Sequence, residues 1–209
     1  MKHGFLISIL CVSSGFAQQF DVSGLIGYGA YRDVRINSTA GTATAGVTNR
    51  FAAGALIGED LYSHISGEVR YLYQDGDPFL SLAGVRGNIQ GQSHTFAYDG
   101  LFHLFDRDRR FRPFVAAGAG GKYYRTTGPA PVPQPFPQIA GLVRENDWEF
   151  VADFGVGFKY RLRNHVMLRG DFRDYITPFP KKLFVPAGNG TDRGLFQQFT
   201  PTLGIGYWF

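Results

Sequence analysis

The segment between Trp148 and Leu162 alternates, residue by residue, between large apolar side chains and small or charged ones. Successive side chains of a β-strand point to opposite faces. The alternation therefore predicts a long strand with one apolar face and one face of glycines and charges. Further stretches show the same period of two, and their residue ranges are 20–34, 51–58, 63–74, 95–105, 111–125, 166–173 and 199–209.

The composition favours an all-β fold in a single domain. Of the 209 residues, 18% are charged, 16% are aromatic and 28 are glycine, a mixture rich in strand formers and turn formers. The formal net charge is +4, and arginines concentrate only in the short run from Arg107 to Arg112. This charge pattern does not indicate nucleic acid as a partner.

The N-terminus has the pattern of a cleaved secretory signal peptide spanning residues 1–17. Lys2 and His3 precede an apolar run from Phe5 to Val12, and small residues up to Ala17 predict cleavage before Gln18. Cys11 lies in this leader, so residues 18–209 contain no cysteine, and Leu10 before it argues against a lipoprotein anchor. No later segment approaches the twenty apolar residues of a membrane helix. A membrane could then be crossed only by a closed barrel.

The connections between the predicted strands alternate in length along the chain. The short ones are centred on residues 59–61, 106–110 and 163–165, and the long ones on residues 37–48, 75–92, 126–146 and 177–194. Segment 79–92 is expected to be a loop with partial strand character, and prolines between Pro129 and Pro137 predict a loop outside any ladder. The alternation predicts an eight-stranded antiparallel up-and-down barrel with short periplasmic turns and long external loops.

Volume decides which face of these strands points inward. The interior of an eight-stranded barrel is just wide enough for side chains, so the aromatic face would overfill it and the face of glycines and charges fits. A soluble barrel with an apolar interior remains the alternative. The predicted lumen charges have both signs and can pair; they are Glu68, Arg70, Asp99, Lys122, Glu149, Asp153, Lys159, Arg169, Asp171 and Arg173.

The last stretch, from Phe199 to Phe209, alternates apolar residues and ends in Tyr-Trp-Phe. Together with the leader and the loop pattern, it resembles the closing strand of small bacterial outer-membrane β-barrels of the OmpA-like, OmpX-like and opacity-protein type. The resemblance implies an outer-membrane location, and a barrel-assembly machinery that reads Tyr207 and Phe209. It also implies a lumen salt-bridge network, contact with membrane lipid and lipopolysaccharide, and a monomer. No peptidoglycan-binding domain is expected after the barrel.

Three functions are compatible with such a barrel, and none calls for a cofactor or metal. The leading hypothesis is a structural or surface-interaction protein with a filled lumen, whose loops meet an unknown partner. A narrow porin-like channel is the second. The third is a lipid A-modifying enzyme using His64, Ser66 and Glu68, which alternate on one strand near the periplasmic rim. Loop cations that could meet lipopolysaccharide phosphates are Lys181, Lys182 and Arg193.

Overall fold

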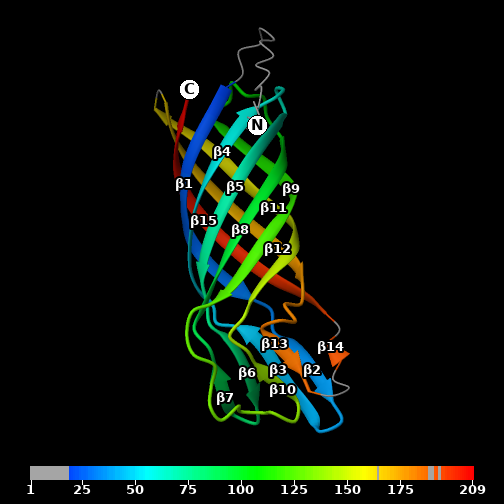
Figure 1. Cartoon of the computed structure of the whole chain (residues 1–209). Helices are drawn as coiled ribbons and strands as arrows, with labels where there is room; N and C mark the ends of the chain where they lie inside the picture. The colour runs from blue at the N-terminus through cyan, green and yellow to red at the C-terminus, as the bar shows by residue number, and fades with distance from the viewer. Residues whose placement is uncertain (1–18, 164, 188–190, 193) are drawn as a thin grey trace, which may run out of the picture.

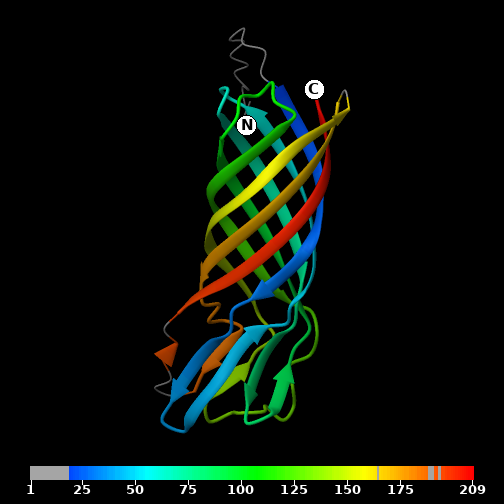
Figure 2. The same cartoon turned by 180° about the vertical axis from the view of Figure 1, so that it is seen from behind.

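The computed structural model describes residues 19–163, 165–187, 191, 192 and 194–209, and its main body is a closed barrel (Figures 1 and 2). The strands pair antiparallel in the order β1-β15-β12-β11-β9-β8-β5-β4. The predicted eight-stranded up-and-down barrel is confirmed. Its strands are β1 (Gln19–Tyr31), β4 (Arg50–Asp60), β5 (Ile65–Asp75), β8 (Gly91–His103), β9 (Phe111–Thr126), β11 (Asn146–Arg163), β12 (Val166–Pro178) and β15 (Leu195–Trp208).

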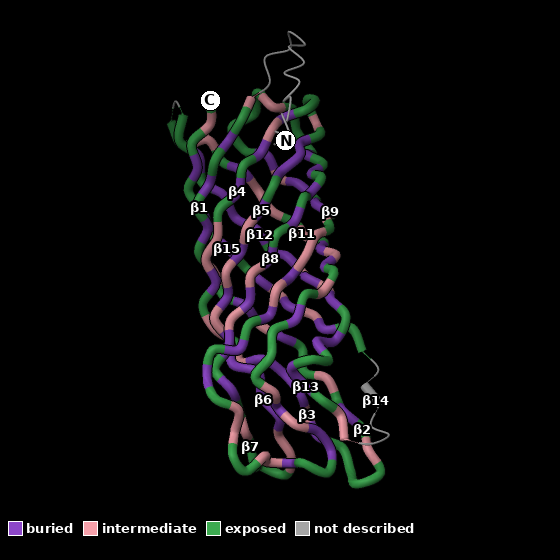
Figure 3. The backbone as a smooth tube through the Cα atoms, viewed as in Figure 1, coloured by how far each residue is buried: buried purple, intermediate pink, exposed green. Residues whose placement is uncertain are grey.

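The period of two in the sequence appears directly as alternating exposure along each strand (Figure 3). On β11, Phe154 and Val156 are 55% and 54% exposed, whereas Asp153 is fully buried. The apolar set therefore faces outward and the charged set faces the lumen, as the volume of the barrel requires. None of the described residues forms a helix long and apolar enough to cross a membrane.

The long connections are more ordered than the sequence predicts. They form the strands β2 (Val34–Ser38), β3 (Gly41–Val47), β6 (Pro78–Leu82), β7 (Val85–Asn88), β10 (Ala140–Leu142), β13 (Phe184–Pro186) and β14 (Thr191–Asp192). Five of them make a sheet in the order β14-β2-β3-β6-β7, and β10 pairs with β13. The expectation that 126–146 lies outside any ladder is wrong for β10, which begins after the last proline of that segment.

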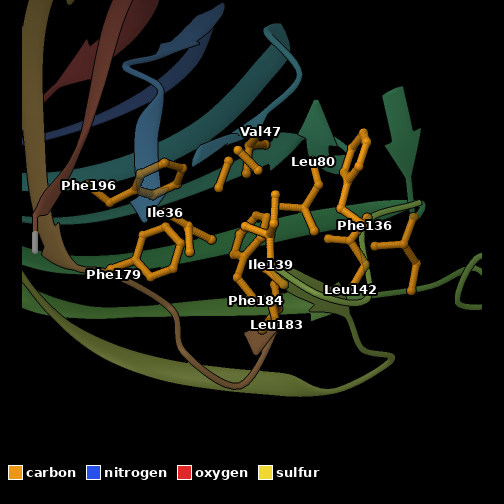
Figure 4. Packing of buried hydrophobic residues seen from close by; sticks show 14 of the residues in the cluster. Ile36, Val47, Leu80, Phe136, Ile139, Leu142, Phe179, Leu183, Phe184 and Phe196 are labelled. Atoms are coloured by element: carbon orange, nitrogen blue, oxygen red, sulfur yellow. The ribbon is translucent and has the colours of Figure 1, made fainter. Parts of the chain in front are cut away.

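We call this second layer the cap; it comprises the described residues of 32–49, 76–90, 127–145 and 179–194. It lies at the end of the barrel opposite the short turns and the C-terminus (Figure 1). A hydrophobic core joins its segments (Figure 4). The buried members contributed by the cap are Ile36, Ala43, Ala45, Val47, Leu80, Ile89, Phe136, Ile139, Ala140, Leu142, Phe179, Leu183 and Phe184, and Tyr31, Tyr124 and Phe196 continue the core into the barrel.

Asp77 links the cap to the barrel through hydrogen bonds. Its buried carboxylate accepts hydrogen bonds from the Arg50 guanidinium at 2.6 Å and from the backbone N–H of Gly91 at 3.3 Å. Its backbone carbonyl accepts the N–H of Thr48 at 2.9 Å. These bonds join the loop before β4 to the loop between β5 and β8, and so hold two cap segments at the barrel rim.

Candidate functional site: the charged lumen

A network of buried ion pairs fills the middle of the lumen. The Arg70 guanidinium lies 2.7 Å from Glu68 on its own strand, β5, and 3.2 Å from Asp99 on the neighbouring strand, β8. Arg169 reaches across to Glu68 at 2.7 Å and bonds Asp171 at 2.6 Å. Arg173 bonds Asp153 at 3.0 Å and Glu68 at 3.0 Å. The side chains of all these residues are at most 1% exposed.

Glu68 is the hub of this network, because it contacts three arginines from two walls of the barrel. Strand β5 supplies Glu68 and Arg70, and strand β12 supplies Arg169 and Arg173 from the other side of the lumen. Buried charges are tolerated when each has a partner in good geometry. The network therefore closes the lumen with side chains that bind one another.

Glycines on the inward face make room for these long side chains. A methyl group on Gly118 would meet carboxylate oxygens of both Asp99 and Asp153. One on Gly155 would meet the Arg173 side chain. The polar face of the strands thus combines small residues with large charged ones, so that the narrow interior is filled without overpacking.

The remaining predicted lumen residues lie apart from this cluster. Lys159 pairs with Asp21 at 2.6 Å near the short-turn end. Lys122, at the cap end, donates to the side chain of Gln198 and lies 4.7 Å from the ring centre of Tyr31. Glu149 is half-buried, also at the cap end.

A second buried cluster lies near the short turns, and its residues were not among the predicted lumen charges. Arg112 bonds Asp60 at 2.7 Å, and the Ser66 hydroxyl donates to the same carboxylate at 2.6 Å. The His103 Nε2 lies 2.8 Å from the Ser66 oxygen. Asp60 was expected in a turn, but it is the last residue of β4 and points inward. The position of Asp60 in the alternating pattern of this strand was the sequence signal that could have shown its inward orientation.

The three residues of the enzymatic hypothesis have separate partners. The ring of His64 lies 2.9 Å from the carbonyl oxygen of His103 and 3.2 Å from Asp106. Ser66 is 1% exposed and binds Asp60 and His103, while Glu68 binds the arginines. The Ser66 hydroxyl therefore donates its hydrogen bond to the Asp60 carboxylate, and the imidazole beside it is that of His103, whereas the ring of His64 contacts His103 and Asp106.

Tyr207 and Phe209 lie at the short-turn end of the closing strand. Tyr207 is exposed on the outer face and pairs in register with Val22 of β1. The backbone N–H of Phe209 donates to the carbonyl of Phe20 at 2.9 Å, and the rings of Tyr207 and Phe209 are 5.0 Å apart. Both aromatic rings therefore belong to the seam between the first and last strands.

No protein-family model and no curated protein sequence matches the chain. Solved structures do resemble it. OprG from Pseudomonas aeruginosa, an outer membrane protein, has a TM-score of 0.55 at 14% identity, covering 91% of this chain and 95% of its own. The outer membrane protein AlkL in lipid bilayers has a TM-score of 0.53 at 18% identity, covering 100% and 97%.

Neisserial surface protein A has a TM-score of 0.52 at 10% identity, covering 90% of this chain and 96% of its own. Identities this low carry information on the fold alone. The agreement extends over nearly the whole length of each protein and over the closed barrel described above. The chain therefore has the fold of the small eight-stranded outer-membrane β-barrels.

Proposed function

We propose that this protein is a non-catalytic outer-membrane barrel that displays a folded cap outside the cell, where the cap meets a partner. The observation that carries the proposal is the hydrophobic core of the cap, which orders four separate connections into one body. If these connections had only to join consecutive barrel strands, flexible loops would be sufficient. A packed surface domain on a filled barrel is the arrangement expected of a display scaffold.

The filled lumen supports the same role. The central network places side chains from β5, β8, β11 and β12 in mutual contact, and each arginine has at least two carboxylate neighbours. A conducting pathway would require these contacts to be broken or bypassed. In addition, the cap lies over the end of the barrel that is opposite the short turns. Both features favour display over passage of solutes.

Export and assembly complete the proposal. The proposed signal peptide, residues 1–17, lies outside the described residues, and cleavage before Gln18 would leave the barrel beginning at its first strand. Tyr207 and Phe209 would be read by the barrel-assembly machinery, since both are exposed aromatic residues at the end of the chain, Tyr207 within the closing strand and Phe209 directly after it. The barrel would function as a monomer among outer-membrane lipids.

Cap lysines are proposed to contact lipopolysaccharide phosphates. Lys182 is exposed and its ammonium lies 2.9 Å from Asp147. The hydrogen bond to Asp147 raises the pKa of Lys182, so the ammonium stays charged at neutral pH. Lys181 is also exposed, whereas Arg193 lies outside the described residues. The pair of lysines at the barrel rim would meet the phosphates of the outer leaflet.

Cysteine labelling in intact cells tests the display. Val132 is 93% exposed in the cap, and Arg109 is exposed on a short turn. A membrane-impermeant maleimide is expected to label Val132→Cys in intact cells, because the cap faces outward. The matched variant Arg109→Cys is expected to react only after the envelope is opened. Labelling of Arg109→Cys in intact cells, with Val132→Cys protected, would reverse the orientation and reject the proposal.

A further inference from the structure

Two hollows lie next to each other on the outer face of the barrel, over the neighbouring strands β4, β5, β8 and β9 (Figure 1). The first has a volume of about 180 Å³ and is lined by Phe20, Ile57, Glu59, Gly67, Val69 and Tyr98, among others. The second has a volume of about 350 Å³ and is lined by Ile65, Gly100, Phe102, Val115 and Ala117, among others. Since a cavity of about 150 Å³ is enough for a benzene molecule, each hollow has room for part of a ligand.

Strand register joins the two hollows into one groove. Glu59 of β4 lies opposite Gly67 of β5, and Gly67 lies opposite Gly100 of β8. Gly100 in turn lies opposite Ala117 of β9. All four positions face away from the lumen, because each alternates along its strand with inward residues such as Glu68. Two glycines and an alanine in this row leave the strand surface low between the larger side chains on either side.

The two hollows differ in chemistry. The second is lined by apolar side chains and glycine, whereas the first contains the carboxylate of Glu59 and the hydroxyl of Tyr98. That hydroxyl leans over Gly67, where a methyl group would meet it. Within the part of the chain that the structure describes, neither polar group has a hydrogen-bond or ion-pair partner. A carboxylate beside lipid is most stable with a cation next to it, so the first hollow suits a cationic group.

The groove rises from the rim of the barrel toward its middle. Glu59 directly precedes the last residue of β4, at the short-turn end, and Gly67 is two residues from the start of β5. Gly100 is three residues from the end of β8, and Ala117 is six residues from the start of β9. A phospholipid has its groups in the same order, with the charged head group in the interfacial layer and the acyl chains in the hydrocarbon core.

We propose that this groove binds one phospholipid whose head group carries a primary ammonium, taken from the membrane leaflet at the short-turn end. The ammonium donates to the Glu59 carboxylate, and the Tyr98 hydroxyl donates to a phosphate or ester oxygen. One acyl chain lies over Gly100 and reaches Ala117. A trimethylammonium head group has no N–H to donate, and an anionic head group is repelled by the carboxylate. Glu59 is therefore the group that selects the lipid, at a site that the display function does not use.

Native mass spectrometry of the refolded protein in a neutral detergent tests the site with phospholipids that share the same acyl chains. Phosphatidylethanolamine is expected to bind with about fivefold higher affinity than phosphatidylcholine, the effect of a partly exposed ion pair. Phosphatidylglycerol is expected to bind no better than phosphatidylcholine. The variant Glu59→Gln is expected to lose this preference and to bind phosphatidylethanolamine only as well as phosphatidylcholine.

A second variant, Gly100→Leu, fills the apolar hollow. A methyl group on Gly100 would come no closer than 3.9 Å to its nearest neighbour, the carbonyl oxygen of Ala117, so the fold tolerates the change. The affinity for both lipids is expected to fall at least about threefold, because the contacts of the acyl chain are lost. Gly24→Leu is the matched control, since Gly24 is exposed on the outer face of β1, outside the groove, and a methyl group there would touch nothing within 4 Å.

Equal affinity of the wild type for phosphatidylethanolamine and phosphatidylcholine would overturn the assignment, as would a preference that survives Glu59→Gln. Tighter binding of phosphatidylglycerol would show that the site selects an anion and would also reject it. Binding by Gly100→Leu that equals binding by Gly24→Leu would mean that the lipid lies elsewhere on the barrel. Heat-dependent migration on gels verifies that each variant is folded.

Discussion

Glu68→Gln is expected to lower the free energy of unfolding of the barrel by about 3–5 kcal/mol, the cost of removing one partner from a buried ion pair. The Glu68 carboxylate lies within 3.0 Å of Arg70, Arg169 and Arg173. Glutamine keeps the size of the side chain, but it removes the negative charge and directs an amide N–H₂ group at guanidinium donors. Three buried positive charges then share fewer carboxylates. Urea unfolding of the refolded protein, followed by tryptophan fluorescence, measures the change.

Glu59→Gln is the matched control for this substitution. Glu59 is on the adjacent strand β4, half-exposed and outside the central network. Its replacement is expected to change the free energy of unfolding by less than about 0.5 kcal/mol, as is usual for surface positions. If Glu68→Gln unfolded at the same urea concentration as Glu59→Gln, the lumen network would not hold the barrel together in the way described.

Phe184→Ala is expected to open the cap while leaving the barrel closed. Phe184 is fully buried in the cap core, and its ring centre lies 5.1 Å from that of Phe179. Truncation of a buried phenylalanine to alanine costs about 3–5 kcal/mol. The cap shares its core with only the ends of the barrel strands, so most of this loss should appear as local opening.

Limited trypsin digestion measures that opening. Cleavage after cap residues such as Arg144 is expected to accelerate by a factor between roughly a hundred and a few thousand, since each 1.4 kcal/mol of local stability is a factor of ten in the open population. The barrel fragment should remain folded on gels. Val185→Ala, at an exposed neighbouring position, is the control and should digest like the wild type. Unchanged digestion of Phe184→Ala would mean that the cap core does not order these connections.

The barrel could be predicted from the sequence because its strands carry a repeated local signal. Each barrel strand separates a membrane face from a lumen face, so alternation is visible without knowledge of the partner strand. The weakest case was 51–58, where alanine and glycine obscure the phase. Its pairing with β1 and β5 fixes the register, with Ile57 facing outward and Leu56 buried.

The cap could not be predicted in the same way. Its strands are short, and their buried positions are occupied by small residues such as Ala43 and Ala45 in a segment that looks polar overall. Its core is assembled from connections far apart in the chain, including Ile36, Leu80 and Leu142. Contacts of this kind depend on the barrel bringing the loops together, and no single window of sequence contains them.

The lumen, likewise, could be predicted only in part. The inward position of each charge followed from the alternation, but the partners depend on strand register and on distance across the barrel. Glu68 and Arg70 lie on one strand, whereas Arg169 and Arg173 reach them from β12. The pairing of Asp60 with Arg112 required the exact end of β4, which the sequence predicts least well.

Single-channel recording in a planar bilayer measures whether the lumen is filled or conducts ions. The refolded protein is expected to be silent, because the arginine and carboxylate side chains of the central network occupy the lumen and the cap lies over one of its ends. Reproducible discrete conductance steps that change on charge reversal at Glu68 or Arg169 would contradict it. They would establish the lumen as an aqueous pathway and the protein as a narrow channel.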